Sequence, residues 1–136
     1  MNSAAPLKKP IVTLTIPGRP IVKKNTKRVY GSGRSKRVVY TDRYRAWHLE
    51  AKRLAAFCFK GALVECLVEA HYRFYFTNRR GEADVSNLCE APGDLLKDAG
   101  VLKDDRLIVR IEAQKYFGHD PRTEIEIYKY EPKEQA

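Results

Sequence analysis

The alternation of apolar and polar positions divides the chain into predicted strands and helices. The stretch Ile11–Ile16 is rich in β-branched residues and predicts a strand. Residues 63–76 alternate so that one parity is wholly apolar or aromatic, which predicts a long strand with that parity facing the core. Two further strands are predicted at 107–117 and 123–130, joined as a hairpin by a loop that contains glycine and proline.

Apolar residues at helical spacing predict two helices. The first begins at Thr41-Asp42, a favourable N-terminus, and its apolar stripe consists of Tyr44, Trp47, Ala51, Leu54, Ala55 and Cys58. The second runs from about 86 to 99, with Gly100 as its stop, and Pro92-Gly93 predicts a kink or a late start. His48 gives no strong signal and is interpreted as a surface or capping histidine rather than a catalytic one.

The order of these elements is strand, basic loop, helix, strand, helix, strand, strand. It predicts an α+β domain, a two-layer sandwich in which a mixed β-sheet packs against helices. The 136 residues correspond to one domain, with residues 1–9 and 131–136 expected to be flexible. Because the chain has no apolar run near the ~20 residues that span a bilayer and no secretory signal, we expect a cytosolic protein without membrane contact.

Cysteine usage agrees with a cytosolic protein. The three cysteines, Cys58, Cys66 and Cys89, form no CxxC or Cys/His pattern. Their odd number and wide spacing argue against a disulfide framework and against a structural zinc site. We interpret them as packing residues or spare thiols.

The charge is distributed unevenly along the chain. The formal net charge is +9. Residues 1–60 hold 15 Lys and Arg against 2 Asp and Glu, whereas residues 61–136 hold 11 against 15, so the halves carry +13 and −4. This asymmetry indicates a first half that binds a polyanion and a second half that retains acidic groups for another purpose. The alternative is a soluble protein with an uneven surface.

Residues 19–37 hold eight basic side chains and no acidic one, around a flexible Gly31-Ser32-Gly33 turn between two predicted ribbons at 28–30 and 37–40. Such a loop suits phosphate binding, because lysine and arginine displace condensed counterions. A solvated charge run without a partner is the alternative. The DNA-binding candidates are Lys23, Lys24, Lys27, Arg28, Arg34, Lys36, Arg37, Arg79 and Arg80.

The acidic residues cluster between positions 82 and 105. Seven carboxylates fall there: Glu82, Asp84, Glu90, Asp94, Asp98, Asp104 and Asp105. Mg²⁺ takes hard oxygen ligands, and phosphodiester cleavage uses such an ion to activate water and to neutralise charge on the phosphate. Carboxylates beside a basic surface therefore indicate a nuclease. The alternative is an ordinary amphipathic helix with a solvated acidic face.

Four spaced elements follow one another in this segment: Asp84-Val85-Ser86-Asn87-Leu88, Asp94-Leu95-Leu96, Ala99-Gly100-Val101 and Lys103-Asp104-Asp105. Together they resemble the signature region of the RusA-like Holliday junction resolvases, which are crossover junction endodeoxyribonucleases of bacteria and phages. The resemblance implies a magnesium-dependent homodimer that binds four-way junctions or other branched DNA and nicks two strands symmetrically, in recombination and repair. Mn²⁺ is a possible substitute for Mg²⁺.

The resemblance also assigns residues. It places the first aspartate of the family motif on Asp84, the helix aspartate on Asp94, and the closing pair on Asp104 and Asp105. The chain departs from the pattern at two positions: the second motif aspartate is Ser86, and a functional lysine of the following turn is Glu90.

Glu90 is our hypothesis for the compensating ligand. Residues four apart share a helix face, so Glu90 lies on the side of Ser86, and a glutamate reaches farther than an aspartate. We therefore hypothesise that Asp84, Glu90 and Asp105, with Asp104 beside them, hold the metal, and that Lys103 replaces the missing cation near the phosphate. If this compensation fails, the chain is a degenerate relative that binds branched DNA without cutting it. A further alternative is a basic RNA-binding module whose acids only aid solubility.

Overall fold

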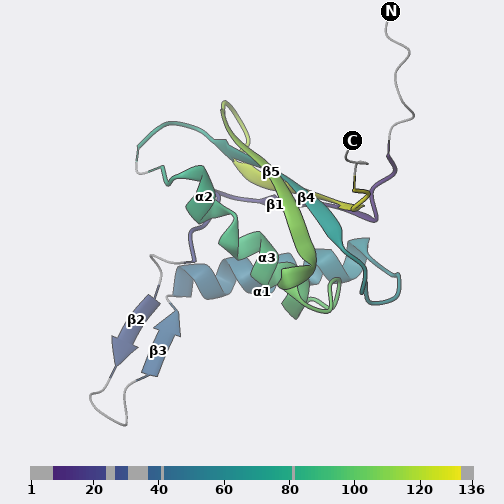
Figure 1. Ribbon diagram of the computed structural model, residues 1–136. Coiled ribbons are helices and arrows are strands. Elements are labelled where there is room, and N and C mark those ends of the chain that lie inside the picture. Colours follow the sequence, from purple (N-terminus) through teal and green to yellow (C-terminus); the bar gives the residue numbers. More distant parts are fainter. Residues whose placement is uncertain (1–7, 24–26, 31–36, 41, 81, 133–136) are drawn as a thin grey trace, which may run out of the picture.

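The computed structural model describes residues 8–23, 27–30, 37–40, 42–80 and 82–132 (Figure 1). The predicted flexible ends, 1–9 and 131–136, lie largely outside these residues. Lys8 is described, and its Nζ lies 3.0 Å from Oε1 of Glu69, so the start of the described chain contacts the body of the domain.

The chain forms an α+β domain of two layers, as predicted. In order, its elements are β1 (Val12–Pro17), β2 (Lys27–Tyr30), β3 (Arg37–Tyr40), α1 (Asp42–Cys58), β4 (Val68–Phe76), α2 (Val85–Leu88), α3 (Glu90–Asp98), the 3₁₀ turn η3 (Asp105–Leu107), β5 (Ile108–Phe117) and β6 (Arg122–Lys129). The main sheet has the order β1-β6-β4-β5, with β4 parallel to β5 and the other pairs antiparallel. The strands β2 and β3 form a separate antiparallel ribbon, which confirms the predicted pair (Figure 1).

One face of the sheet and the helices enclose the core. The buried strand residues are Val12, Leu14, Ile16, Val68, Ala70, Tyr72, Phe74, Phe76, Ile125 and Ile127. The buried helix residues are Tyr44, Trp47, Ala51, Ala55, Leu88, Ala91, Leu95 and Leu96. The predicted apolar parity of β4 is thus the inner one. Cys58, which was assigned to the stripe of the first helix, is exposed because it is the last residue of α1.

The predicted hairpin between the last two strands is wrong. The strand β4 lies between β5 and β6 and pairs with both of them. The four residues 118–121 can reach across β4, because a span of two strand spacings is roughly 10 Å and four extended residues cover about 13 Å. At this crossing the N–H of Gly118 donates to the carbonyl of Phe76 at 2.9 Å. The strand β4 has the longest row of buried apolar and aromatic residues in the sheet, and a central place buries that row most completely.

Two predicted boundaries also shift. The strand predicted from 63 begins at Val68, because Val64 instead pairs with the turn after α3, donating its N–H to the carbonyl of Val101 at 2.8 Å. The helix predicted over 86–99 is interrupted at Cys89, and α3 starts at Glu90. Pro92 falls in the first turn of α3, where the missing N–H costs no hydrogen bond, so the predicted late start is confirmed.

The outer face of the sheet is polar and internally paired. Glu69 is only 6% exposed, and its carboxylate contacts His71 at 2.8 Å, Arg110 at 2.7 Å and Lys8 at 3.0 Å. The hydrogen bonds to His71 and Lys8 lower the pKa of Glu69 to about 2. The negative charge of Glu69 is therefore part of what holds Lys8 and β5 onto β4.

We expect Glu69→Gln to reduce the free energy of unfolding at neutral pH by about 1–2 kcal/mol, because it replaces charged hydrogen bonds by neutral ones. The folded-state pKa lies below the ordinary value of 4.5, so this contribution is present above that pH and is lost as the pH falls toward about 2. Urea denaturation of both proteins from about pH 7 to pH 3 checks it. The exposed Glu131→Gln serves as the control, and a loss independent of pH would contradict the account.

Candidate functional site

Asp84 is the residue directly before α2, and its backbone caps that helix. Its carbonyl accepts the N–H groups of Asn87 at 3.1 Å and of Leu88 at 3.2 Å, whereas its side chain makes no capping hydrogen bond. The preceding carbonyl, of Ala83, accepts Nζ of Lys115 at 3.1 Å, which ties this turn to β5. Asp84 itself is exposed. Its carboxylate is therefore accessible to a ligand that arrives from solvent.

The closing acidic pair lies in the turn between α3 and β5. The N–H of Arg106 donates to Asp104 Oδ1 at 2.9 Å, and this hydrogen bond holds the pKa of the Asp104 carboxyl below its ordinary value. Asp105 begins η3 and is exposed. A Cβ added at Gly93 would lie 3.8 Å from Cβ of Asp105, so η3 packs directly against the middle of α3.

Glu90 is exposed at the start of α3. It lies three residues before Gly93 and four after Ser86, and residues at these spacings share a helix face. Cys89, where the helix is interrupted, has φ −73° and ψ −17°, so the relation of Glu90 to Gly93 lies within α3, whereas its relation to Ser86 crosses the break. The spacing therefore directs Glu90 toward the side of α3 on which Asp105 packs.

The four predicted metal ligands lie on neighbouring elements but not in one tight group. The helix α3 contacts both α2 and η3. Asp84 precedes Gly93 by nine residues, roughly 13 Å of helical rise. Among the described residues, two groups of three metal-ligating side chains have all their ligand atoms within 4.8 Å of one another. Neither group contains Asp84, Glu90, Asp104 or Asp105. This donor set fits Mg²⁺, which usually binds one or two protein carboxylates and keeps several waters.

Lys103, the proposed cation, pairs with a different acidic residue. Its Nζ lies 3.1 Å from Oε1 of Glu65, and both side chains are 64% exposed. Its N–H donates to the carbonyl of Val64 at 3.0 Å, which holds the turn against the segment before β4. An exposed pair of this kind contributes at most about 1 kcal/mol, so the amine leaves Glu65 at little cost.

Two uncharged side chains, buried Tyr72 and half-buried Cys89, lie beneath the acidic segment, and the sequence does not reveal this arrangement. The hydroxyl of Tyr72, on the inner face of β4, has no hydrogen-bond partner among the described residues. Burial raises the pKa of Tyr72, and the nearby charge of Asp105 raises it further. Burial also raises the pKa of the Cys89 thiol to about 11, and Sγ lies 3.3 Å from the carbonyl of Val85. The only sequence signal for Tyr72 is its place in the apolar parity of the strand.

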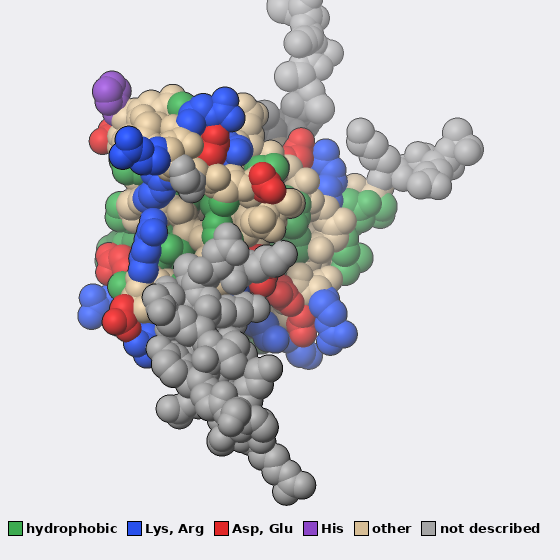
Figure 2. Space-filling view, turned by 90° about the vertical axis from the view of Figure 1, so that its left-hand side faces the viewer, with side chains coloured by type: hydrophobic (Ala, Val, Ile, Leu, Met, Phe, Trp, Pro, Cys, Tyr) green, Lys and Arg blue, Asp and Glu red, His purple; other side chains and the backbone are tan. Residues whose placement is uncertain are grey.

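The DNA-binding candidates are described to different extents. Lys24, Arg34 and Lys36 lie outside the described residues, and Lys27, Arg28 and Arg37 lie on β2 and β3, of which the backbone alone is described. Nζ of Lys23 lies 3.1 Å from Oδ1 of Asp94, Arg79 pairs with Glu82, and Arg80 is exposed. Figure 2 shows the side from which β2 and β3 project, where Lys and Arg side chains are frequent and acidic ones lie among them.

The helices α1 and α3 bring together three side chains that the sequence did not connect. Nε2 of His48 lies 2.9 Å from Oδ2 of Asp98, and the ligand atoms of His48, Asp94 and Asp98 all lie within 4.8 Å of one another. The sequence gives no strong signal for His48; in the structure its side chain, which is 16% exposed, bridges α1 and α3. The four-residue spacing of the aspartates was visible in the sequence, but the helix that faces them was not.

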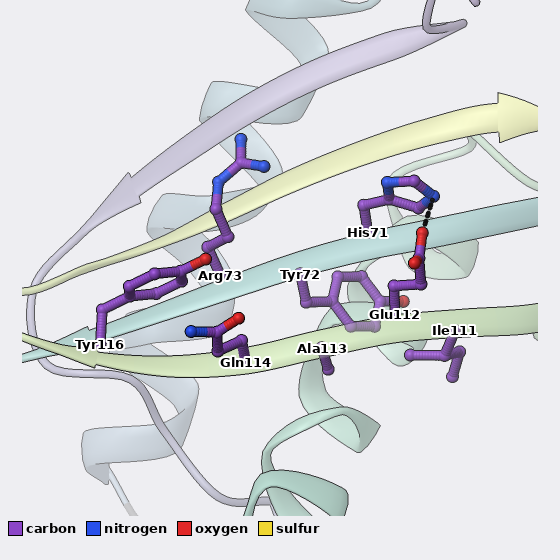
Figure 3. Close-up of a pocket in the computed structure, with 8 residues that line it drawn as sticks. All are labelled: His71, Tyr72, Arg73, Ile111, Glu112, Ala113, Gln114 and Tyr116. Atoms are coloured by element: carbon purple, nitrogen blue, oxygen red, sulfur yellow. Dashed lines mark ion pairs between the residues drawn. The ribbon is translucent and has the colours of Figure 1, made fainter.

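A pocket of about 510 Å³ lies along β4 and β5, and its lining includes side chains of the outer face of the sheet. Figure 3 shows its lining from β4 and β5: His71, Tyr72, Arg73, Ile111, Glu112, Ala113, Gln114 and Tyr116. Nε2 of His71 lies 3.0 Å from Oε2 of Glu112 (Figure 3). Nε of Arg73 lies 2.7 Å from Oε1 of Glu124. Because acids and bases neutralise one another here, this face attracts a polyanion less than the side of the β2–β3 ribbon.

None of the helices that the structure describes is long and apolar enough to cross a membrane.

Comparisons with known proteins assign the family. The search of curated proteins gave no match. The family model of the endodeoxyribonuclease RusA matches residues 17–128, a range that includes both the basic stretch and the whole acidic segment. The predicted resemblance is confirmed: the chain belongs to the RusA endodeoxyribonuclease family.

Proposed function

We propose that this protein is a magnesium-dependent, structure-selective endodeoxyribonuclease that resolves Holliday junctions or other branched DNA. One observation carries the proposal: the family match spans the basic stretch and the turn that sets Asp105 against α3. The basic part would hold the DNA backbone, and the acidic part would hold the ion.

The proposed metal site consists of Asp84, Glu90, Asp104 and Asp105. When bound, Mg²⁺ or Mn²⁺ would lower the pKa of a water molecule and neutralise charge on the phosphate. Asp105 and Glu90 would supply ligands from the two sides of the contact between η3 and α3. The backbone N–H of Arg106 holds the pKa of the Asp104 carboxyl below its ordinary value, which suits a cation ligand.

Lys103 would act as the cation near the phosphate, in place of the lysine that the family pattern has where this chain has Glu90. Its exposed pair with Glu65 is weak, and it adjoins Asp104 and Asp105 in the chain. A lysine amine released from this pair can contact a phosphate oxygen. The role of Lys103 would be to orient the phosphate, not to transfer a proton.

The basic side chains would bind the DNA backbone. The proposed contacts are Lys23, Lys24, Lys27, Arg28, Arg34, Lys36, Arg37, Arg79 and Arg80. The loop that bears Arg79 and Arg80 leads directly into Asp84, so phosphate contacts there would lie next to the acidic site. Phosphate contacts fix register and orientation, and the shape of a branched DNA would then select the substrate.

The exposed edge of β5 supports a homodimer. This strand pairs with β4 on one side and ends the sheet on the other. Val109 and Ile111 on it are each 47% exposed. An unpaired edge strand is a template for another chain. In an antiparallel pairing centred on Ile111, Arg110 would lie opposite Glu112 of the partner subunit, which is a complementary arrangement.

We expect Asp105→Asn and Asp84→Asn to lower magnesium-dependent nicking of a synthetic four-way junction by roughly 100-fold or more, while junction binding persists. Glu90→Gln should have an intermediate effect if Glu90 is a ligand. The matched control is Asp120→Asn, an exposed loop residue, which should retain full activity. Unchanged nicking in Glu90→Gln would remove this residue from the ligand set.

The same assay separates the alternatives. Tight junction binding without cleavage in magnesium or manganese would favour a degenerate branched-DNA-binding protein, for which Ser86 and Glu90 are the motivating departures. Binding of linear RNA as tightly as junctions, at matched salt, would favour an RNA-binding module.

We expect Lys27→Ala combined with Arg28→Ala to weaken junction binding and to reduce its salt dependence. Each lost phosphate contact should lower the slope of log affinity against log salt by roughly 0.9. Titrations at several salt concentrations measure the slope. The exposed Lys129→Ala is the control. An unchanged slope in the double variant would place the DNA path elsewhere.

We expect light scattering to give a mass of twice 15.6 kDa for the protein in solution. Ile111→Lys should shift the equilibrium toward monomer, because it places a charge in the proposed pairing. Thr13→Lys, on the opposite edge strand β1, is the control and should remain dimeric. A monomeric wild-type protein would exclude the dimer.

A further inference from the structure

A cluster of metal-ligating side chains lies between α1 and α3 and includes none of the four proposed nuclease ligands. His48 comes from α1, and Asp94 and Asp98 come from successive turns of α3. The imidazole Nε2 lies 2.9 Å from Oδ2 of Asp98, and one ligand atom from each of the three residues falls within 4.8 Å of the others. Three ligands from two packed helices, with an imidazole among them, are a common basis of a metal centre.

The cluster is held in place by its surroundings. The hydroxyl of Tyr44 donates to Oδ2 of Asp94 at 3.0 Å, and Nζ of Lys23 lies 3.1 Å from Oδ1. Hydrogen bonds of this kind orient a carboxylate ligand and fix its position. The two aspartates are four residues apart on one helix, so α3 places them on the same side without any adjustment of a loop.

The site has room for further ligands. A cavity of about 410 Å³ lies over the cluster and is lined by Tyr44, Arg45, His48, Leu49, Lys52, Asp94 and Asp98. Water molecules in this cavity can complete a coordination shell around an ion held by three protein ligands. Asp98, at the end of α3, is about half exposed, so an ion has a path from solvent.

We propose that His48, Asp94 and Asp98 bind one divalent transition-metal ion of the zinc class. Imidazole nitrogen selects zinc, cobalt or nickel over magnesium, which prefers an all-oxygen shell. The site is therefore distinct in chemistry from the proposed nuclease site. Lys23 offsets the charge of Asp94, so the ion should bind less tightly than at a site with two unpaired carboxylates.

A second group provides an internal contrast. Glu69, His71 and Glu112, on the outer face of the sheet, also have ligand atoms within 4.8 Å of one another. Arg110, however, contacts both of these carboxylates, at 2.7 and 3.2 Å, and Lys8 contacts Glu69 as well. An ion would have to displace these cations, so this group is expected to remain a salt-bridge network.

An ion between α1 and α3 would join the two functional halves of the molecule. The β2–β3 ribbon leads into α1, and α3 carries Glu90 at its start. Coordination from both helices would hold the base of the basic ribbon at a constant position relative to the acidic segment. Binding to the folded state alone would also raise the melting temperature.

The test measures metal binding to the full chain in excess magnesium, so that the nuclease site is occupied by that ion. Calorimetry with Zn²⁺ should show one site per chain, and Co²⁺ should give an absorption spectrum without the thiolate charge-transfer band that binding at exposed Cys58 or Cys66 would produce. Asp98→Asn and His48→Gln should each weaken Zn²⁺ binding by about tenfold or more and abolish the rise in melting temperature.

Two variants make the result decisive. His71→Gln, in the contrasting group, should bind Zn²⁺ as the wild type does. Asp105→Asn should also retain Zn²⁺ binding while losing nicking, so failure of the nuclease proposal and failure of this one are distinguishable. No Zn²⁺ binding by the wild-type chain, or equal binding by Asp98→Asn, would overturn the proposal. Loss of binding in His71→Gln alone would also overturn it, because the ion would then lie on the outer face.

Discussion

The parallel pairing of β4 with β5 is the constraint on which the rest of this structure depends. Parallel neighbours cannot be joined by a tight turn, so the chain must leave the end of β4 and return to the start of β5 by a crossover. That crossover is the segment 77–107, and it contains all seven clustered carboxylates. Its helices must bury Leu88, Leu95 and Leu96 on the sheet. Burial of one side of the crossover leaves Asp84 and Glu90 on the other side, in contact with solvent.

The two ends of this crossover explain how residues far apart in the motif become neighbours. The turn η3 leads into β5, and it packs on α3 next to Gly93, where an added Cβ would lie 3.8 Å from Cβ of Asp105. Asp105 is thereby set against a helix that begins fifteen residues earlier, at Glu90. The uncharged side chains of Tyr72 and Cys89 lie beneath this segment.

Charge is separated in this molecule by face and by element. The outer face of the sheet pairs its acids with its bases: Arg73 contacts Glu124 and Glu126, and Arg110 contacts Glu69 and Glu112. The excess positive charge lies instead in the first sixty residues, from which the β2–β3 ribbon projects. In the proposed function, a polyanion would therefore approach the side of the ribbon rather than the open sheet face. The α1–α3 cluster lies where the basic half meets the acidic segment, which is why an ion there would affect both.

The sequence by itself determined the strands and helices, the inner parity of β4, the basic ribbon and the family, because each depends on local periodicity, local charge or an ordered motif. It did not determine that β4 separates the last two strands, since pairing partners are chosen by burial of whole faces rather than by proximity along the chain. It identified Asp94 and Asp98 but not His48 as their neighbour, because a helix face reveals its own spacing and not the element that packs on it. Only the tertiary structure decided these contacts: they depend on how two helices pack against one sheet, and that packing is a property of the folded chain as a whole.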